Sequence, residues 1–240
     1  MLATSASAQE PVRFLVSSAW SMPVGELRTQ GGQQQLVAGI MKEWQEQLAA
    51  ALQRPVALVI VPRKREAAVA LAGAADLRCF MSPDWVRSEP ADLYDWPPPI
   101  ITIEERLVGH RSKPLIASSD ELRDVRLGTV AGYHYPSLAL ALQRQNVRRD
   151  DAPTESAAFA KQLAGRVDYT VMRDIDFRYL KAVRREAVAH LMMSPLVVAS
   201  TPVHCARIRA GSVPLPDLLA AQEKLIKQGV LGVIRARYAQ

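Results

Sequence analysis

The sequence predicts an α/β fold of two lobes, because a strand-helix-strand-helix-strand order occurs twice along its 240 residues. In the first 85 residues, short apolar runs alternate with amphipathic or alanine-rich segments, and a similar alternation begins again near Ile100. Such alternation favours a mostly parallel sheet with helices on its faces. The length agrees with two lobes of about a hundred residues each.

The first lobe is expected to contain three strands and two helices. In chain order we expect a strand at 12–19, a loop at 21–35, a helix at 36–53, a strand at 56–61, a helix at 66–71 and a strand at 76–81. The run Val56–Val61 is continuous and rich in β-branched residues, which predicts a strand covered on both faces. Pro55 ends the helix before this run, and Gly73 ends the helix after it.

The second lobe is expected to follow the same scheme. In chain order we expect an extended segment at 100–108, one helical turn opened by the capping box Ser118–Glu121, a strand at 125–130, a helix at 136–145, a helix at 155–164 and a strand at 167–172. Thr154 is expected to cap the start of the helix at 155–164, and Gly165 its end.

The last forty-odd residues have a different pattern. Extended runs at 196–200 and 203–208 are separated by Pro202, and Asp217 is expected to cap a helix that runs through Gln228. The residues of this helix expected to face inward are Leu218, Leu219, Gln222, Leu225 and Ile226.

Composition and charge exclude several classes of protein. The formal net charge is +6, but basic clusters such as Arg63–Arg65 are short, separated and not interleaved with aromatic residues, so we expect no nucleic-acid partner. Two cysteines are too few for a disulfide-built miniature scaffold or a multi-cysteine zinc site. No run of about 18 apolar residues is present to span a membrane.

The first residues suggest export. Residues 1–10 are small and polar, and Ala6 and Ala8 fit the small-x-small pattern before a signal-peptidase cleavage site, as if the charged and apolar parts of a signal peptide were truncated. A merely disordered tail is the alternative. Export would permit a disulfide between Cys79 and Cys205, although two buried free thiols agree equally well with the sequence.

Several short motifs occur in a familiar order. They are Ala74–Leu77, Arg106–Gly109, Leu127–Tyr133, Gly165–Tyr169 and the ending Gly229-Val230-Leu231 with Ile234 and Tyr238. In this order and spacing the chain resembles the family 3 extracellular solute-binding proteins of the amino-acid-binding type, over about residues 12–238.

The resemblance implies a type II periplasmic binding fold with two hinge crossovers, near 99–108 and 191–201. Lobe 1 would comprise 11–99 and 200–240, and lobe 2 would comprise 100–199. The ligand, a small amino acid or carboxylate, would bind between the lobes, which close by a hinge motion. The resemblance also implies that the protein is a periplasmic monomer, that it has no cofactor and that it delivers its ligand to an inner-membrane ABC permease.

In the first lobe, the family holds the ligand carboxylate with an arginine, whose planar fork pairs bidentately with such a group. Arg87 lies one position from that place, and the surrounding motif is not kept, so a solvated surface arginine is the alternative. The other first-lobe residues expected near the ligand are Ser18, Trp20, Met81, Ser82 and Trp85.

In the second lobe, Gly132, Tyr133, His134 and Tyr135 occupy a strand-to-helix turn, where backbone N–H groups can accept an anion. Where the family binds the ligand amine with an acidic residue, this chain has Arg173, and Asp174 follows. If Arg173 faces the ligand, an anion without an α-amine is favoured. If Asp174 faces it, an amino acid remains plausible, because a one-residue slip exchanges the two faces of a strand.

Two other functions agree with the same resemblance. One is a sensor domain with a signalling partner, and the other is an enzyme similar to cyclohexadienyl dehydratase, for which Glu155, His134 and Asp174 are the candidate acids or bases. We expect no enzyme, because the four histidines show no metal spacing and no nucleophile elbow, phosphate loop or dinucleotide fingerprint is present.

Overall fold

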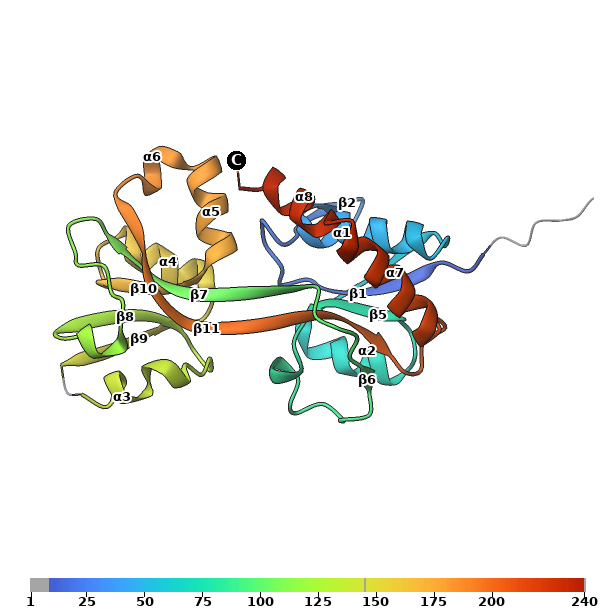
Figure 1. Ribbon diagram of the computed structural model, residues 1–240, viewed down its shortest axis with the longest axis horizontal. Helices are drawn as coiled ribbons and strands as arrows, with labels where there is room; N and C mark the ends of the chain where they lie inside the picture. Colours follow the sequence, from blue (N-terminus) through green and yellow to red (C-terminus); the bar gives the residue numbers. More distant parts are fainter. Residues whose placement is uncertain (1–8, 145, 240) are drawn as a thin grey trace, which may run out of the picture. The chain divides into compact units, whose positions relative to one another are not determined.

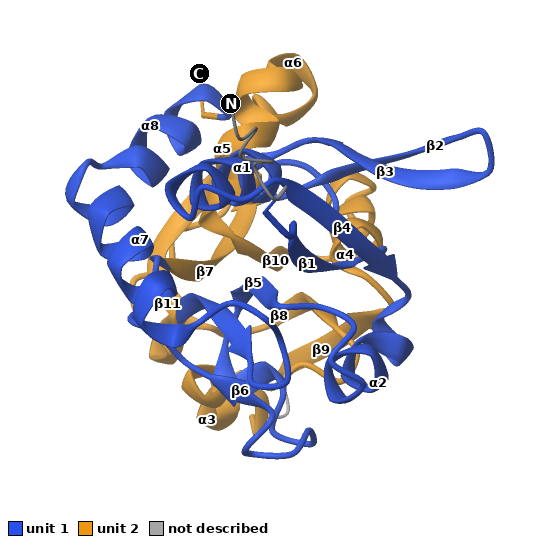
Figure 2. Cartoon of the chain, turned by 90° about the vertical axis from the view of Figure 1, so that its right-hand side faces the viewer, with its two compact units in different colours: residues 1–101, 202–238 blue, residues 102–201, 239–240 orange. Residues whose placement is uncertain are grey.

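The computed structural model describes residues 9–144 and 146–239, which form two compact α/β units (Figure 1). Unit 1 comprises the chain up to Ile101 together with Pro202–Tyr238, and unit 2 comprises Thr102–Thr201 (Figure 2). Unit 2 is thus inserted into the sequence of unit 1. Residues 1–8 of the expected export-signal remnant lie outside the described residues.

Unit 1 contains seven strands or parts of strands among its described residues. They are β1 (Val12–Ser17), β2 (Glu26–Gln30), β3 (Gln33–Ala38), β4 (Val56–Val61), β5 (Leu77–Met81), β6 (Tyr94–Asp95) and the last part of β11 (Leu191–Ile208). The helices are α1 (Ile40–Ala51), α2 (Glu66–Leu71), α7 (Leu215–Lys227) and α8 (Val230–Arg237), with 3₁₀ turns η1 (Arg63–Arg65) and η2 (Pro83–Trp85).

The sheet of unit 1 has the strand order β4-β1-β5-β11. The first three strands are parallel, and β11 runs antiparallel to β5. Helices α1, α7 and α8 pack together on one side of this sheet, and α2 lies on the other (Figure 1). Leu15 of β1 joins Ala70 of α2 in a buried cluster, so the sheet is covered where these helices lie.

Strand β4 is confirmed, but its predicted double coverage is wrong. It is the edge strand of the unit 1 sheet, and Val56 and Leu58 are 38% and 36% exposed. A continuous apolar run therefore does not separate a central parallel strand from an edge strand, because both are built from β-branched residues.

The segment before α1 also differs from expectation. The predicted loop at 21–35 contains most of the hairpin β2–β3, which extends away from the sheet of unit 1 (Figure 2). Leu36 belongs to β3, and the helix begins only after Gly39, whose φ of +117° interrupts the helical backbone.

Unit 2 contains strands β7 (Ile101–His110), β8 (Val125–Val130), β9 (Val147–Ala152), β10 (Tyr169–Arg173) and the first part of β11. Its helices are α3 (Ala139–Leu142), α4 (Glu155–Leu163), α5 (Asp174–Val183) and α6 (Arg185–Val188), with 3₁₀ turns η3 (Ser119–Glu121) and η4 (Pro136–Leu138). The order β9-β8-β10-β7, with β7 antiparallel to β10, repeats the topology of unit 1.

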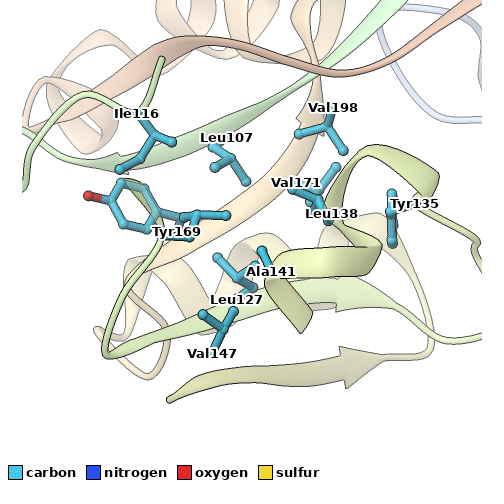
Figure 3. Close-up of a cluster of buried hydrophobic side chains, with 11 residues drawn as sticks. Leu107, Ile116, Leu127, Tyr135, Leu138, Ala141, Val147, Tyr169, Val171 and Val198 are labelled. Atoms are coloured by element: carbon cyan, nitrogen blue, oxygen red, sulfur yellow. The ribbon is translucent and has the colours of Figure 1, made fainter. Parts of the chain in front are cut away.

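Neighbouring residues of the unit 2 strands serve two separate cores, as the pleat of a strand requires. Leu107 and Val171 point into a cluster covered by η4 and α3 (Figure 3). Val108 and Met172, one residue further along each strand, pack with Phe159 of α4 on the opposite face. Both faces of this sheet are therefore buried.

In each unit an aspartate that directly precedes one strand is hydrogen-bonded to the neighbouring parallel strand: Asp76 before β5 to β1, and Asp168 before β10 to β8. The carboxylate of Asp76 accepts hydrogen bonds from the backbone N of Arg13 (2.8 Å), the guanidinium of Arg13 (2.7 Å) and the backbone N of Ser212 (2.7 Å). In unit 2, Asp168 accepts from the backbone N of Arg126 at 2.8 Å. The Asp76 side chain is fully buried, so these bonds satisfy a charge that would otherwise be costly.

The C-terminal elements correct three expectations. β11 continues through Pro202 as one strand of 18 residues, and α7 begins at Leu215 after Pro214 rather than at a cap by Asp217. Leu219 and Ile226, expected to face inward, are 38% and 42% exposed.

Strand β11 also carries one half of a disulfide. Cys79 of β5 and Cys205 of β11 lie opposite each other in the antiparallel pair and are joined by a disulfide bond. This decides between the two states that the sequence left open.

Candidate functional site

The polar loops of unit 1 emerge at one edge of its sheet. Phe14 pairs with Leu77 and Ser17 with Val61, so the ends of β1, β4 and β5 lie side by side. The backbone N of Ser18 donates to the carbonyl of Val61 at 2.9 Å. In parallel sheets this carboxyl-terminal edge is where ligands bind.

The predicted first-lobe residues lie at or near this edge but differ in exposure. Ser18 and Trp20 are half-buried, Met81 and Ser82 are buried, and Trp85 is 38% exposed. The Ser82 hydroxyl has no hydrogen-bond partner among the described residues.

Arg87 is an exposed residue with a local partner. Its side chain is 78% exposed, and its guanidinium pairs with Asp84 at 2.7 Å within the same turn. It also lines a cavity of about 230 Å³ together with Glu89, Tyr94 and Trp96. The role predicted for Arg87 in holding a ligand carboxylate stays a prediction.

The predicted second-lobe residues lie at the corresponding edge of unit 2. Leu127 pairs with Tyr169, which places the segment after β8 beside the end of β10. Gly132, at a φ of +78°, makes the turn in a conformation that suits glycine. Tyr133 is half-buried and His134 is exposed, whereas Tyr135 is buried in the hydrophobic core of unit 2 (Figure 3).

Arg173 is held by two carboxylates. Its Nε donates to Asp176 at 2.7 Å and its Nη2 to Glu155 at 2.8 Å, and its side chain is 10% exposed. The strand ends at Arg173 and α5 begins at Asp174, so the alternation of faces assumed for this pair does not apply. Both residues are largely buried.

A third carboxylate faces the same guanidinium. Glu105 of β7 is the register partner of Arg173 across the antiparallel pair. Burial, reinforced by the nearby Glu155, raises the pKa of Glu105 to about 7. Burial also raises the pKa of Asp176 to about 6, although Arg173 opposes the shift. One cation among three carboxylates leaves an excess of negative charge that protons can relieve.

This arrangement limits what Arg173 can do. A ligand carboxylate would have to compete with Glu155 and Asp176 for the guanidinium, whereas a ligand amine would meet surplus carboxylate. No sequence pattern indicated that Glu105 and Asp176 belong to this cluster around Arg173, and Glu155 entered only as an acid or base for the enzyme hypothesis. Glu155 and Asp176 lie in the first turns of α4 and α5, whereas Glu105 lies in the middle of β7.

No metal site and no membrane span are found in residues 9–144 and 146–239. None of the His, Cys, Asp and Glu side chains there form a group of three that could hold a metal ion. No helix in the same residues is both long and apolar enough to cross a bilayer.

Solved structures share this arrangement over nearly the whole chain. An ancestral cationic amino acid solute-binding protein matches with a TM-score of 0.72 at 16% identity, over 96% of each chain. The periplasmic VFT2 domain of BvgS from Bordetella pertussis matches with a TM-score of 0.69 at 19% identity, over 95% of this chain and 92% of that one. The chain has the periplasmic-binding-protein fold.

A third structure with this periplasmic-binding-protein fold comes from a transporter. It is the amino acid ABC transporter substrate-binding protein AbpA from Streptococcus pneumoniae, bound to L-arginine, with a TM-score of 0.62 at 17% identity over 96% of this chain and 92% of that one. Neither a protein-family model nor a curated protein sequence matches the chain. At such identities the likeness concerns the fold, as predicted from the sequence motifs, and not the ligand.

Proposed function

We propose that this chain is an exported solute-binding protein that captures a small polar or anionic molecule, an amino acid or a carboxylate, for an ABC-type permease. The observation that carries the proposal is the periplasmic-binding-protein fold, with polar loops gathered at the carboxyl-terminal strand edge of each unit. Catalysis is not part of the proposal.

The disulfide supports the periplasmic location. Disulfides persist in oxidising compartments and are rare in the cytosol. Cys79 and Cys205 are both almost fully buried, which protects the bond from reductants.

A screen of ligands by thermal shift tests the proposal. A ligand at a hundredfold excess over its Kd stabilises the native state by about 2.7 kcal/mol, which is a measurable rise in Tm. We expect amino acids or small carboxylates to raise the Tm, and Arg87→Ala to reduce the effect if Arg87 holds the ligand carboxylate. No shift with either class would contradict a solute-binding function.

Hinge closure, implied by the resemblance, is part of the same proposal. Small-angle scattering with and without the stabilising ligand tests it, because closure lowers the radius of gyration.

A sensor domain is the second candidate, favoured by the match to the BvgS domain. Transport and sensing require the same capture of ligand but different partners. A pull-down of membrane proteins by this chain, with and without the ligand, shows whether the bound partner is a permease or a signalling protein.

A further inference from the structure

We propose that the turn Arg63–Lys64–Arg65, here called the basic turn, recognises an anionic group of the ligand, so that unit 1 favours small molecules with a net negative charge. This inference rests on the proposed function and specifies its ligand class.

The basic turn lies beside the residues that were expected to meet the ligand. It follows β4 directly, and Val61 at the end of β4 is the register partner of Ser17 and accepts the hydrogen bond of the Ser18 backbone N. The backbone N of Arg65 donates to Pro62 at 2.8 Å and closes the 3₁₀ turn. The three cations are thereby presented at the carboxyl-terminal edge of the unit 1 sheet.

The charges of the basic turn are not offset by the protein. All three residues are exposed, and their side chains make no ion pair or hydrogen bond within residues 9–144 and 146–239. The next residue, Glu66, is 3% exposed and turned inward, where it pairs with Arg78. It therefore does not neutralise the turn.

Other arginines near the strand ends already have anionic partners. Arg87 pairs with Asp84, and Arg173 pairs with Glu155 and Asp176. Among the cations near these strand ends, the basic turn is stabilised most by a bound anion, because its three adjacent positive charges repel one another and a bound anion reduces that repulsion. Arginine forks fit carboxylate and phosphate equally well.

The ligand class follows from this charge. A cationic ligand is repelled, and a zwitterion with no net charge gains little from long-range attraction. A small dicarboxylate or a phosphorylated compound carries a net negative charge and offers an anionic group to the basic turn. Both share the chemistry of a multiply charged anion.

Calorimetric titration of the full chain with four probes tests the inference: succinate, inorganic phosphate, glycine and L-arginine. The variant R63Q/R65Q removes two charges from the turn, and R184Q/R185Q removes two exposed charges from unit 2 as a matched control. We expect succinate, phosphate or both to bind, with an affinity that falls at least tenfold in R63Q/R65Q and stays within twofold in the control. Binding of succinate alone identifies a dicarboxylate, and binding of phosphate alone identifies a phosphoryl group.

Two outcomes overturn the inference. Binding of glycine or L-arginine with neither anion bound refutes it and leaves the proposed function standing, whereas binding of no probe counts against both. Equal losses in the two double variants show a response to total charge rather than recognition by the basic turn. Circular dichroism of both variants establishes that they are folded.

Discussion

Removal of the disulfide should destabilise unit 1 selectively. The bond between Cys79 and Cys205 closes a loop with a sequence separation of 126 residues. In the chain-entropy treatment, a loop of this length restricts the unfolded chain by about 5 kcal/mol at 25 °C. This value is an upper bound. Unit 2 lies within the loop, and if unit 2 stays folded while unit 1 unfolds, fewer residues of the loop are free to gain conformational entropy.

The assay can observe unit 1 alone. All four tryptophans, at positions 20, 44, 85 and 96, belong to unit 1, so tryptophan fluorescence in a urea titration reports its unfolding. We expect the variant C79A/C205A to unfold at lower urea, with a free energy of unfolding reduced by 2–5 kcal/mol. Circular dichroism includes unit 2 and should show a second transition that moves little.

Controls separate the bond from the packing of the two side chains. In the presence of dithiothreitol, the free energy of unfolding of the wild-type protein should agree with that of the variant to within about 1 kcal/mol, which is the cost of a small cavity. Dithiothreitol should not affect the variant. A loss below 1 kcal/mol, or two free thiols measured in the denatured wild type, would refute the reasoning.

Three further predictions concern charges and a cap. Asp76→Asn should cost unit 1 about 3 kcal/mol, because it weakens the hydrogen bonds and the ion pair that the fully buried carboxylate makes, and Asp168→Asn should cost unit 2 less since Asp168 is 27% exposed. Arg13 and two backbone N–H groups hold the pKa of Asp76 below its usual range despite burial, so its contribution is lost as the pH falls through that pKa. Glu105 has a raised pKa, about 7, so the native state holds a proton that the unfolded chain releases, and stability should fall as the pH rises from about 4.5 to about 7. Glu105→Gln should remove up to about 3 kcal/mol of this fall, with Glu104→Gln as the matched control; an unchanged pH dependence in urea titrations followed by circular dichroism, which includes unit 2, would contradict the assignment. Thr154→Ala should cost unit 2 about 1 kcal/mol, because the Thr154 side chain accepts a hydrogen bond from the backbone N–H of Ala157; a loss below 0.3 kcal/mol in a urea titration followed by circular dichroism would refute this.

The strands predicted from the sequence were those with apolar runs. The expected strands at 56–61, 76–81 and 125–130 are confirmed within a residue. Their apolar side chains pack into the hydrophobic cores of unit 1 and unit 2. Strand β9 was missed, since its sequence Val-Arg-Arg-Asp-Asp-Ala has the composition of a loop. It pairs on one side only, with β8, and an edge strand tolerates charged residues.

The predicted break at Pro202 failed for a different reason. The pairing of β11 with β5 begins at His204, so the missing amide hydrogen of Pro202 removes no bond from that ladder. The expected break assumes that the proline removes a hydrogen bond from a ladder, and Pro202 lies outside the ladder with β5.

The candidate site was the least predictable part. Arg173 was singled out from the sequence, but Glu155 and Asp176, which come from the first turns of two helices, were not predicted as its partners. Which carboxylates converge on one guanidinium depends on how α4 and α5 dock on the sheet, and no local pattern contains that information. The ligand roles of the twelve predicted residues stay predictions.

The insertion of unit 2 into unit 1 has a consequence for the order of folding during synthesis. Chains emerge from the N-terminus, yet the last part of β11, α7 and α8, which belong to unit 1, emerge only after Thr102–Thr201 of unit 2. The unit that starts first is therefore completed last, and the thiol of Cys79 has no native partner until Cys205 emerges. A chaperone or thiol oxidant that acts during synthesis would therefore bind a chain in which Thr102–Thr201 of unit 2 is complete while unit 1 still lacks its last segment.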